Sequence, residues 1–249
     1  MKVIPLGVNG AFTNYYHNNY VFELGNRKLL VDAGTTLRYS LKEAGYEETD
    51  ITDVIITHLH SDHIGGLEEF AQRCKWIHNH KPNLWIRTQM VGELCQILNS
   101  GLCTDGLKLT DYFNFQIVDD GFVIDDNQSF YEVEIIETDD LHAKNMLSIA
   151  LKINDIKKDI NLIFSGDIAK HKMVQFDRVF EYNTVALFHD VSLVKNPVHS
   201  YIEDVIEYYK DKIDLNKIYA MHYQDDVNIE ELEKQYEINF VMPRRVYEF

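Results

Sequence analysis

The stretch HLHSDH (His58–His63) places four residues of metal-ligand type within six positions, directly after the apolar run DVIIT. That apolar run predicts a buried β-strand. Side chains two positions apart on an extended strand point the same way, so His58 and His60 can bind one metal ion. The chain must then turn, and the turn offsets Asp62 and His63 sideways. We therefore predict a two-metal site at the end of this strand.

Three further residues of metal-ligand type stand at or near the ends of predicted strands. His142 comes after the run YEVEIIET, Asp167 follows LIFSG, and His222 lies within KIYAMHY. Imidazole and carboxylate together suit zinc, with manganese or iron as alternatives. A carboxylate between two ions can bridge them, and two ions about 3.5–4 Å apart activate water against a phosphoryl or carbonyl group.

The composition restricts where the protein acts and what it binds. The 249 residues include 24 Lys+Arg against 40 Asp+Glu, for a formal net charge of −16. Surfaces that grip long nucleic acid or anionic lipid are usually basic, so we expect neither partner, although local metal ions can still hold a small anion. There is no long apolar run and no signal-peptide pattern, and Cys74, Cys95 and Cys103 lack a C-x-x-C spacing. We expect a cytoplasmic protein with reduced thiols and no membrane span.

Two halves of the chain have the same outline. Residues 19–34 predict a hairpin around Gly25-Asn26 that ends near Asp32, and residues 146–167 predict a second strand pair that ends at Asp167. Helices are predicted at Leu37–Ala44, Leu67–Arg73, Met90–Asn99 and Tyr201–Lys210. We predict one α/β domain over residues 1–249, a sheet-on-sheet sandwich with outer helices.

The order of these residues resembles the metallo-β-lactamase superfamily along essentially the whole chain. The resemblance implies a four-layer αββα sandwich with the metals at one edge of the two sheets. It implies that Asp32 orients the site, although an ordinary turn aspartate is the alternative. It also implies two ligand groups that share Asp167: His58, His60 and His142 for one ion, and Asp62, His63 and His222 for the other.

Two later segments narrow the chemistry. Asp190 lies in FHDVS and His199 in PVHS, which look like the His-Glu-Ala-Thr and His-Ser-Thr signatures of the tRNA 3′-processing endonucleases (ribonuclease Z). Asp190 replaces the glutamate and Tyr201 the threonine. A carboxylate-held His199 would protonate the departing alkoxide of a phosphodiester or bind a phosphate oxygen, and Asp62 would assist the attacking water. The alternatives are a helix-start role for His199 and a plain loop role for Asp190.

The interval between His142 and Asp167 disfavours tRNA as the substrate. The tRNA enzymes carry a long arm, commonly between the third and fourth metal motifs, but only 24 residues separate His142 from Asp167, and two strands use them. The sequence is instead similar to the phage-encoded anti-Pycsar phosphodiesterases and their bacterial relatives. That resemblance implies a zinc-dependent homodimer that opens 3′,5′-cyclic CMP or UMP, and cyclic AMP or GMP, to linear nucleoside monophosphates. For a phage protein the location would be the host cytoplasm.

The segment Leu102–Phe115 is our expectation for a loop that closes the pocket of the partner subunit. Its residues Tyr112 and Phe113 are the candidates for stacking on a base; the alternative is that both pack into the protein's own core. Other activities remain open from the sequence alone. They are a ribonuclease-Z-like endonuclease, a lactone or thioester hydrolase, and a binding protein that sequesters nucleotides without cleaving them.

Overall fold

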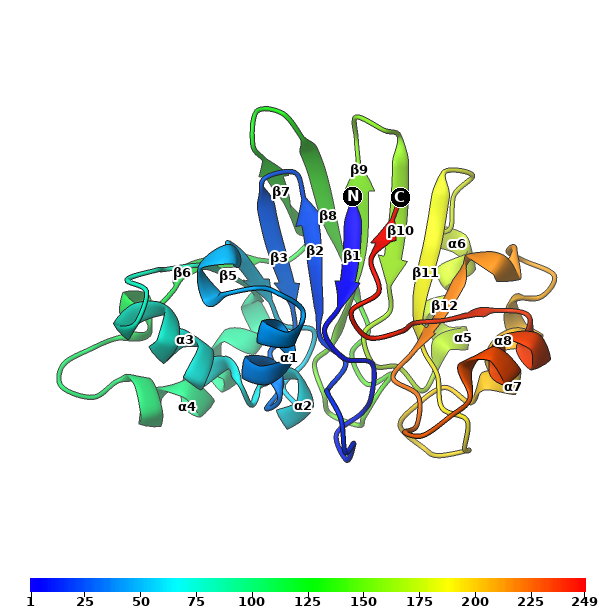
Figure 1. The fold of residues 1–249 in the computed structure, drawn as a ribbon, viewed down its shortest axis with the longest axis horizontal. Coiled ribbons are helices and arrows are strands. Elements are labelled where there is room, and N and C mark those ends of the chain that lie inside the picture. The colour runs from blue at the N-terminus through cyan, green and yellow to red at the C-terminus, as the bar shows by residue number, and fades with distance from the viewer.

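The computed structural model describes residues 1–249 as two seven-stranded sheets packed face to face (Figure 1). The first sheet has the order β14 (Tyr247–Glu248), β1 (Lys2–Pro5), β2 (Tyr20–Leu24), β3 (Arg27–Val31), β4 (Asp53–Ile55), β5 (Asn83–Arg87) and β6 (Asn114–Val118). The second has the order β13 (Asn239–Phe240), β12 (Ile218–Met221), β11 (Thr184–Asp190), β10 (Ile160–Phe164), β9 (Ile149–Asp155), β8 (Phe130–Glu137) and β7 (Gly121–Asp125).

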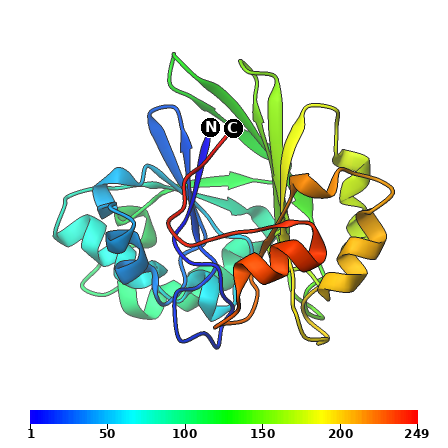
Figure 2. The same ribbon diagram turned by 45° about the vertical axis from the view of Figure 1, so that its right-hand side comes forward.

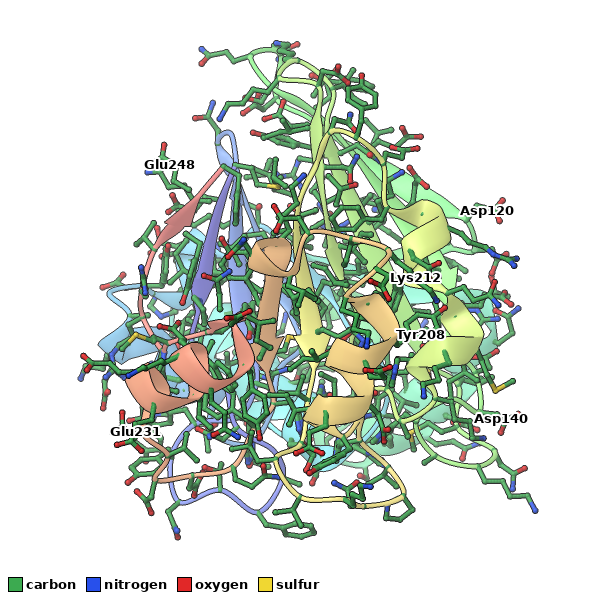
Figure 3. The ribbon with its side chains drawn as sticks, turned by 90° about the vertical axis from the view of Figure 1, so that its right-hand side faces the viewer. Asp120, Asp140, Tyr208, Lys212, Glu231 and Glu248 are labelled. Atoms are coloured by element: carbon green, nitrogen blue, oxygen red, sulfur yellow. The ribbon has the colours of Figure 1, made fainter.

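Helices cover the outer side of each sheet, which confirms the predicted αββα arrangement (Figure 2). The first sheet carries α1 (Leu37–Glu43), α2 (Ser61–Ile64), α3 (Leu67–Trp76) and α4 (Val91–Leu102). The second carries α5 (His171–Val174), α6 (Phe176–Val179), α7 (Ile202–Tyr209) and α8 (Ile229–Tyr236). Figure 3 shows α7 and α8 in front of the second sheet, with Lys212 beside the ring of Tyr208; its Nζ lies 3.1 Å from the ring centroid. None of the helices is long and apolar enough to cross a membrane.

The two sheets repeat one strand pattern. In each, two antiparallel pairings are followed by three parallel ones, from β1 to β6 and again from β8 to β13. The predicted hairpin is confirmed: Leu24 pairs with Arg27, and Gly25 has a φ of +63° in the two-residue turn. Parallel neighbours end at a common edge of their sheet, so residues that follow these strands gather there.

Side-chain alternation along β2 explains how the layers pack. Tyr20 and Phe22 face the second sheet, while Val21 faces the helices. The ring of Tyr20 meets those of Phe164 and Phe188 edge-on, with centroids 5.0 and 6.1 Å away. This aromatic contact joins the sheets directly below the edge where β10 and β11 end.

The chain ends lie side by side, because β14 pairs with β1 and the Met1 ammonium donates to the carbonyl of Phe249 at 3.2 Å (Figure 1). Among the elements that were not predicted from the sequence are β1, β13, β14 and α8. Three of these are strands of two to four residues. Strands that short carry too little periodicity to be recognised without their partners.

Two buried histidines lie between the second sheet and its helices. His171 Nδ1 bonds Ser200 Oγ at 2.9 Å, and His189 Nδ1 bonds the Asp190 carbonyl at 2.6 Å. Burial lowers the pKa of His171 to about 4 and that of His189 to about 3. Both imidazoles are therefore neutral in the folded protein at neutral pH.

These histidines should make the fold sensitive to acid. Their folded pKa values lie below the unfolded value of about 6.5, so unfolding takes up protons between pH 6.5 and 4. The free energy of unfolding should fall across that window by up to about 1.4 kcal/mol per pH unit for each histidine. Urea titrations of His171→Asn, with metal present throughout, should show a shallower decline than the parent. An equal slope in both proteins would contradict the assignment.

Candidate metal centre

The HLHSDH stretch is shaped by a strand that gives way to a one-turn helix. His58 comes three residues after β4, and His60 is still extended, with φ −71° and ψ 155°. The chain then enters α2, which carries Asp62 and His63. The change from extended to helical backbone turns the last two side chains away from the first two. The structure thus produces the sideways offset predicted from the sequence.

The first candidate group consists of His58, His60 and His142. His60 Nδ1 lies 3.1 Å from His58 Nε2 and 3.1 Å from His142 Nε2. Nitrogen atoms held by one tetrahedral Zn²⁺ at about 2.0–2.1 Å would be about 3.3 Å apart. The observed spacing fits three imidazoles that share one cation.

The second candidate group consists of Asp62, His63, Asp167 and His222. Asp167 Oδ2 lies 3.1 Å from His222 Nε2 and 3.3 Å from His63 Nε2. The same oxygen is 3.9 Å from Nε2 of both His58 and His142. Asp167 therefore stands between the two groups, where a bridging carboxylate would be needed.

The polar atoms in this second group are arranged to bind a cation. His63 Nε2, His222 Nε2 and Asp167 Oδ1 are buried without a hydrogen-bond partner. Burial opposes charge on His63, but the carboxylates of Asp167 and Asp32 outweigh it and raise its pKa well above the ordinary value. An environment that stabilises a proton on a buried imidazole also stabilises a metal ion there, and the ion would satisfy the unpaired atoms.

Hydrogen bonds on the far side of the rings set their orientation. His63 Nδ1 donates to Asp32 Oδ2 at 2.7 Å, and the other Asp32 oxygen accepts from the Thr57 backbone N–H at 2.7 Å. His142 Nδ1 donates to the Val198 carbonyl at 2.6 Å. Both rings thus present Nε2 to the centre.

A carboxylate–histidine pair stands beside the metal groups. His199 Nδ1 lies 2.9 Å from Asp190 Oδ2, which also accepts from the Ile168 backbone N–H at 2.8 Å. Asp190 is fully buried, whereas the His199 side chain keeps 19% exposure. Burial opposes charge on His199, but Asp190 outweighs it and raises its pKa. The ring of His199 therefore bonds an acid and not its own backbone.

These residues surround a pocket of about 600 Å³. Its wall includes His60, Asp62, His142, Asp167, His199 and His222, together with the β1–β2 loop residues Gly10, Ala11, Phe12 and Thr13. This loop was not identified from the sequence. Its signal was the segment GVNGAF, with two glycines in six residues, ahead of the first predicted hairpin.

Tyr112 and Phe113, proposed above to stack on a base, lie elsewhere. Both are buried in the core between the first sheet and its helices, at 3% and 0% exposure. Neither lines the pocket of its own chain. Their aromatic rings serve packing, since the short turn Leu109–Asp111 directs them inward.

The two sheets, the outer helices and the His/Asp groups at their edge define a metallo-hydrolase of the metallo-β-lactamase fold with a divalent-metal site. Solved structures with this fold align over the whole chain. A metallo-β-lactamase fold protein, YhfI from Bacillus subtilis, has a TM-score of 0.75 at 18% identity, covering 100% of this chain and 98% of its own. The short form of human tRNase Z has a TM-score of 0.70 at 15% identity, covering 100% and 99%.

The sequence places the chain within this class more narrowly. The profile of the family described as "Anti-Pycsar protein Apyc1" matches residues 1–247. A relative of that name from Paenibacillus sp. (strain J14) is 32% identical, covering 91% of both chains. Another from Bacillus phage vB_BveM-Goe7 is 31% identical, covering 91% of this chain and 90% of its own. The chain belongs to the anti-Pycsar protein Apyc1 family.

Replacing Asp32 should weaken metal binding without removing any candidate ligand. Asp32→Asn loses the charge that holds His63 Nδ1–H, and loss of such an outer partner typically costs 10–100-fold in metal affinity. Competition with a chromogenic chelator measures the change. The matched control is Asp105→Asn, an exposed aspartate that also has positive φ (52°, against 66° for Asp32). Equal metal affinity in both variants would show that Asp32 does not orient the site.

Proposed function

We propose that this protein is a zinc-dependent phosphodiesterase that hydrolyses 3′,5′-cyclic mononucleotides to linear nucleoside monophosphates. Cyclic CMP and UMP are the proposed substrates, with cyclic AMP and GMP also accepted. The observation that carries the proposal is the Asp190–His199 pair, which lines the same pocket as both metal groups. Hydrolysis of a β-lactam or lactone needs no second acid–histidine pair, whereas an alkoxide leaving phosphorus needs a proton or a cation.

Two Zn²⁺ ions fit the donor chemistry, and Mn²⁺ is the alternative. The ligands proposed for one ion are His58, His60 and His142, and for the other Asp62, His63 and His222, with Asp167 shared. When bound, such ions supply Lewis-acid stabilisation of the phosphoryl oxygens and a nucleophile at neutral pH. The chain's own part is to hold these donors in place through Asp32 and the Val198 carbonyl.

His199 is positioned to act on the leaving group. Asp190 keeps its Nδ1 protonated and leaves Nε2 to donate a proton to the departing ribose oxygen or to bind a phosphate oxygen. Because Asp190 also bonds the Ile168 N–H, the carboxylate cannot rotate freely. Asp62, whose Oδ2 lies 3.3 Å from His63 Nε2, would orient the attacking water in addition to serving as a metal ligand.

The size of the site and the short connections around it favour a small substrate. A pocket of about 600 Å³ lies in the range that encloses a small ligand. Between His142 and Asp167 the chain forms the β9–β10 hairpin, whose loop is only Ile156–Asp159, so this interval holds no RNA-gripping arm. The net charge of −16 further opposes a long polyanion.

The biological role follows from the same chemistry. Removal of cyclic mononucleotides would end the antiviral signal that such nucleotides carry, which agrees with the name of the curated relatives. We propose that the protein acts in the cytoplasm, as a homodimer. Sedimentation of the purified protein would report the oligomeric state.

Side-by-side assays test the proposed function. With added Zn²⁺ or Mn²⁺, the protein should convert cyclic UMP to linear UMP and leave precursor tRNA intact, and a chelator should abolish the reaction. His63→Ala and Asp167→Ala should lose both metal and nearly all activity, because each removes a candidate ligand. Cleavage of precursor tRNA without hydrolysis of cyclic UMP would show that the protein is a ribonuclease-Z-like endonuclease. Intact nucleotide recovered from a stoichiometric complex would identify a binding protein.

The role of His199 predicts a different signature. His199→Ala should reduce kcat by about 10²–10⁴-fold, the range of one general acid, while the metal content stays at two ions. Elemental analysis and steady-state kinetics of the same preparation measure both. His78→Ala is the matched control, because His78 also bonds an acid (Glu48, 2.9 Å) but lies outside the pocket. Loss of metal in His199→Ala would show that His199 is a ligand or a structural residue.

A further inference from the structure

The β1–β2 loop presents an aromatic ring to water at the mouth of the metal pocket. Phe12 is fully exposed, and it lines the pocket together with His60, Asp62 and His222. In Figure 1 the loop is the dark blue segment that projects beyond the sheets below β1 and β2. A phenylalanine in that position forgoes all the stabilisation that burial would give it. Because this exposed ring does not stabilise the fold, a role in ligand binding explains its location at the pocket better.

The backbone near Phe12 packs closely against one residue of the metal groups. A Cβ atom at Gly10 would lie 2.5 Å from Cε1 of His222, so the loop crosses the ring at a distance that only glycine permits. Two residues of chain span at most about 7 Å, which keeps Phe12 within a side chain's reach of that ligand. The loop therefore cannot move away from the site without losing its contact with His222.

The other side of the loop is tied to the segment that follows His222. The Asp225 carboxylate accepts from Thr13 Oγ1 at 2.6 Å and from the Asn14 N–H at 2.7 Å. Tyr15 OH donates to Asp226 at 2.5 Å. These bonds order the residues immediately after Phe12. Binding of a ligand to the Phe12 ring would therefore cost little further backbone entropy.

Phe12 is the exposed aromatic surface of the pocket. The other apolar residues in the wall are Ala11, Val198 and Tyr223, of which Tyr223 is 4% exposed and bonds the Val241 carbonyl through its hydroxyl. All remaining lining residues are polar, charged or glycine. One end of the pocket thus suits a phosphate, and the loop suits a flat apolar group.

From this arrangement we infer that Phe12 forms a nucleobase subsite, on which the base of the substrate stacks while its phosphate lies at the metal donors. The inference rests on the proposed function and extends it to a residue that determines substrate affinity. Stacking tolerates every base, because each has a π-face, so one ring can serve both pyrimidine and purine cyclic nucleotides. The base remains outside the reacting centre, and Phe12 acts on binding rather than on the chemical step.

The test compares substrates with and without a base. For cyclic AMP, Phe12→Ala should raise KM by about 5- to 150-fold with kcat unchanged, the range expected for loss of one base–aromatic stack. For 1-O-methylribose 3′,5′-cyclic phosphate, which has no base, KM should not change. Phe12→Trp should retain the low KM for cyclic AMP. Tyr182→Ala, which removes another exposed aromatic ring outside the pocket, is the control.

Each outcome decides between the subsite and its alternatives. An equal rise in KM for both compounds, or no rise for cyclic AMP, overturns the subsite. If the equal rise comes with loss of dimer in sedimentation, Phe12 belongs to a contact between subunits. If the wild type hydrolyses neither these two compounds nor cyclic UMP, the proposed function fails. In that case calorimetry of cyclic AMP binding tests the Phe12 subsite separately. Equal affinity of the wild type and Phe12→Ala for cyclic AMP, or no binding to either, overturns the subsite.

Discussion

The buried carboxylate of Asp167 is the constraint on which the rest of this site depends. Removing a carboxylate from water costs several kcal/mol, and nearby positive charge or hydrogen-bond donors must offset that cost. Four imidazole Nε2 atoms lie within 4 Å of Asp167 Oδ2, two from each candidate metal group: those of His58, His142, His63 and His222. The rings of His63 and His142 are themselves held from behind by hydrogen bonds of Nδ1, so they cannot rotate freely. Cations at this point would satisfy the carboxylate and the unpaired imidazole atoms together.

Each half of the fold contains a buried carboxylate that joins two neighbouring parallel strands, although the two carboxylates stand on non-equivalent strands of the repeat. In the first half Asp32 follows β3 and accepts from the backbone N–H of Thr57, beyond the neighbouring strand β4. In the second half Asp190 ends β11 and accepts from the N–H of Ile168, beyond the neighbouring strand β10. Each carboxylate thereby joins the ends of two parallel strands, and each also holds an imidazole: Asp32 holds His63 and Asp190 holds His199. Asp32 thus orients a candidate ligand, and Asp190 holds the residue proposed as the proton donor.

The sequence was sufficient where function depends on short, dense patterns. HLHSDH, with the later His142, Asp167 and His222, predicted two neighbouring donor groups, and alternating strands predicted the layers. Residue type alone does not determine whether an aromatic ring in a loop is buried in the core or exposed at the pocket. Tyr112 and Phe113 looked available in a polar loop, yet the Leu109–Asp111 turn places both in the core. Phe12 gave no signal in the sequence, and its neighbour Thr13 is held by Asp225, which lies 212 positions further along the chain.

The acidity of the protein is compatible with the proposed binding of a phosphate, because the two act at different distances from the metal donors. Two divalent ions would bring four positive charges, which the carboxylates of the site (Asp32, Asp62, Asp167 and Asp190) balance. A protonated His199 then leaves a small positive surplus, enough for the single charge of a cyclic phosphodiester. Beyond about 8 Å, the Debye length at physiological salt, a ligand meets the surface of a protein with net charge −16. A polyanion would have to cross that surface, whereas the proposed mononucleotide would end within the pocket, with its one phosphate at the metal donors and its uncharged base on the loop.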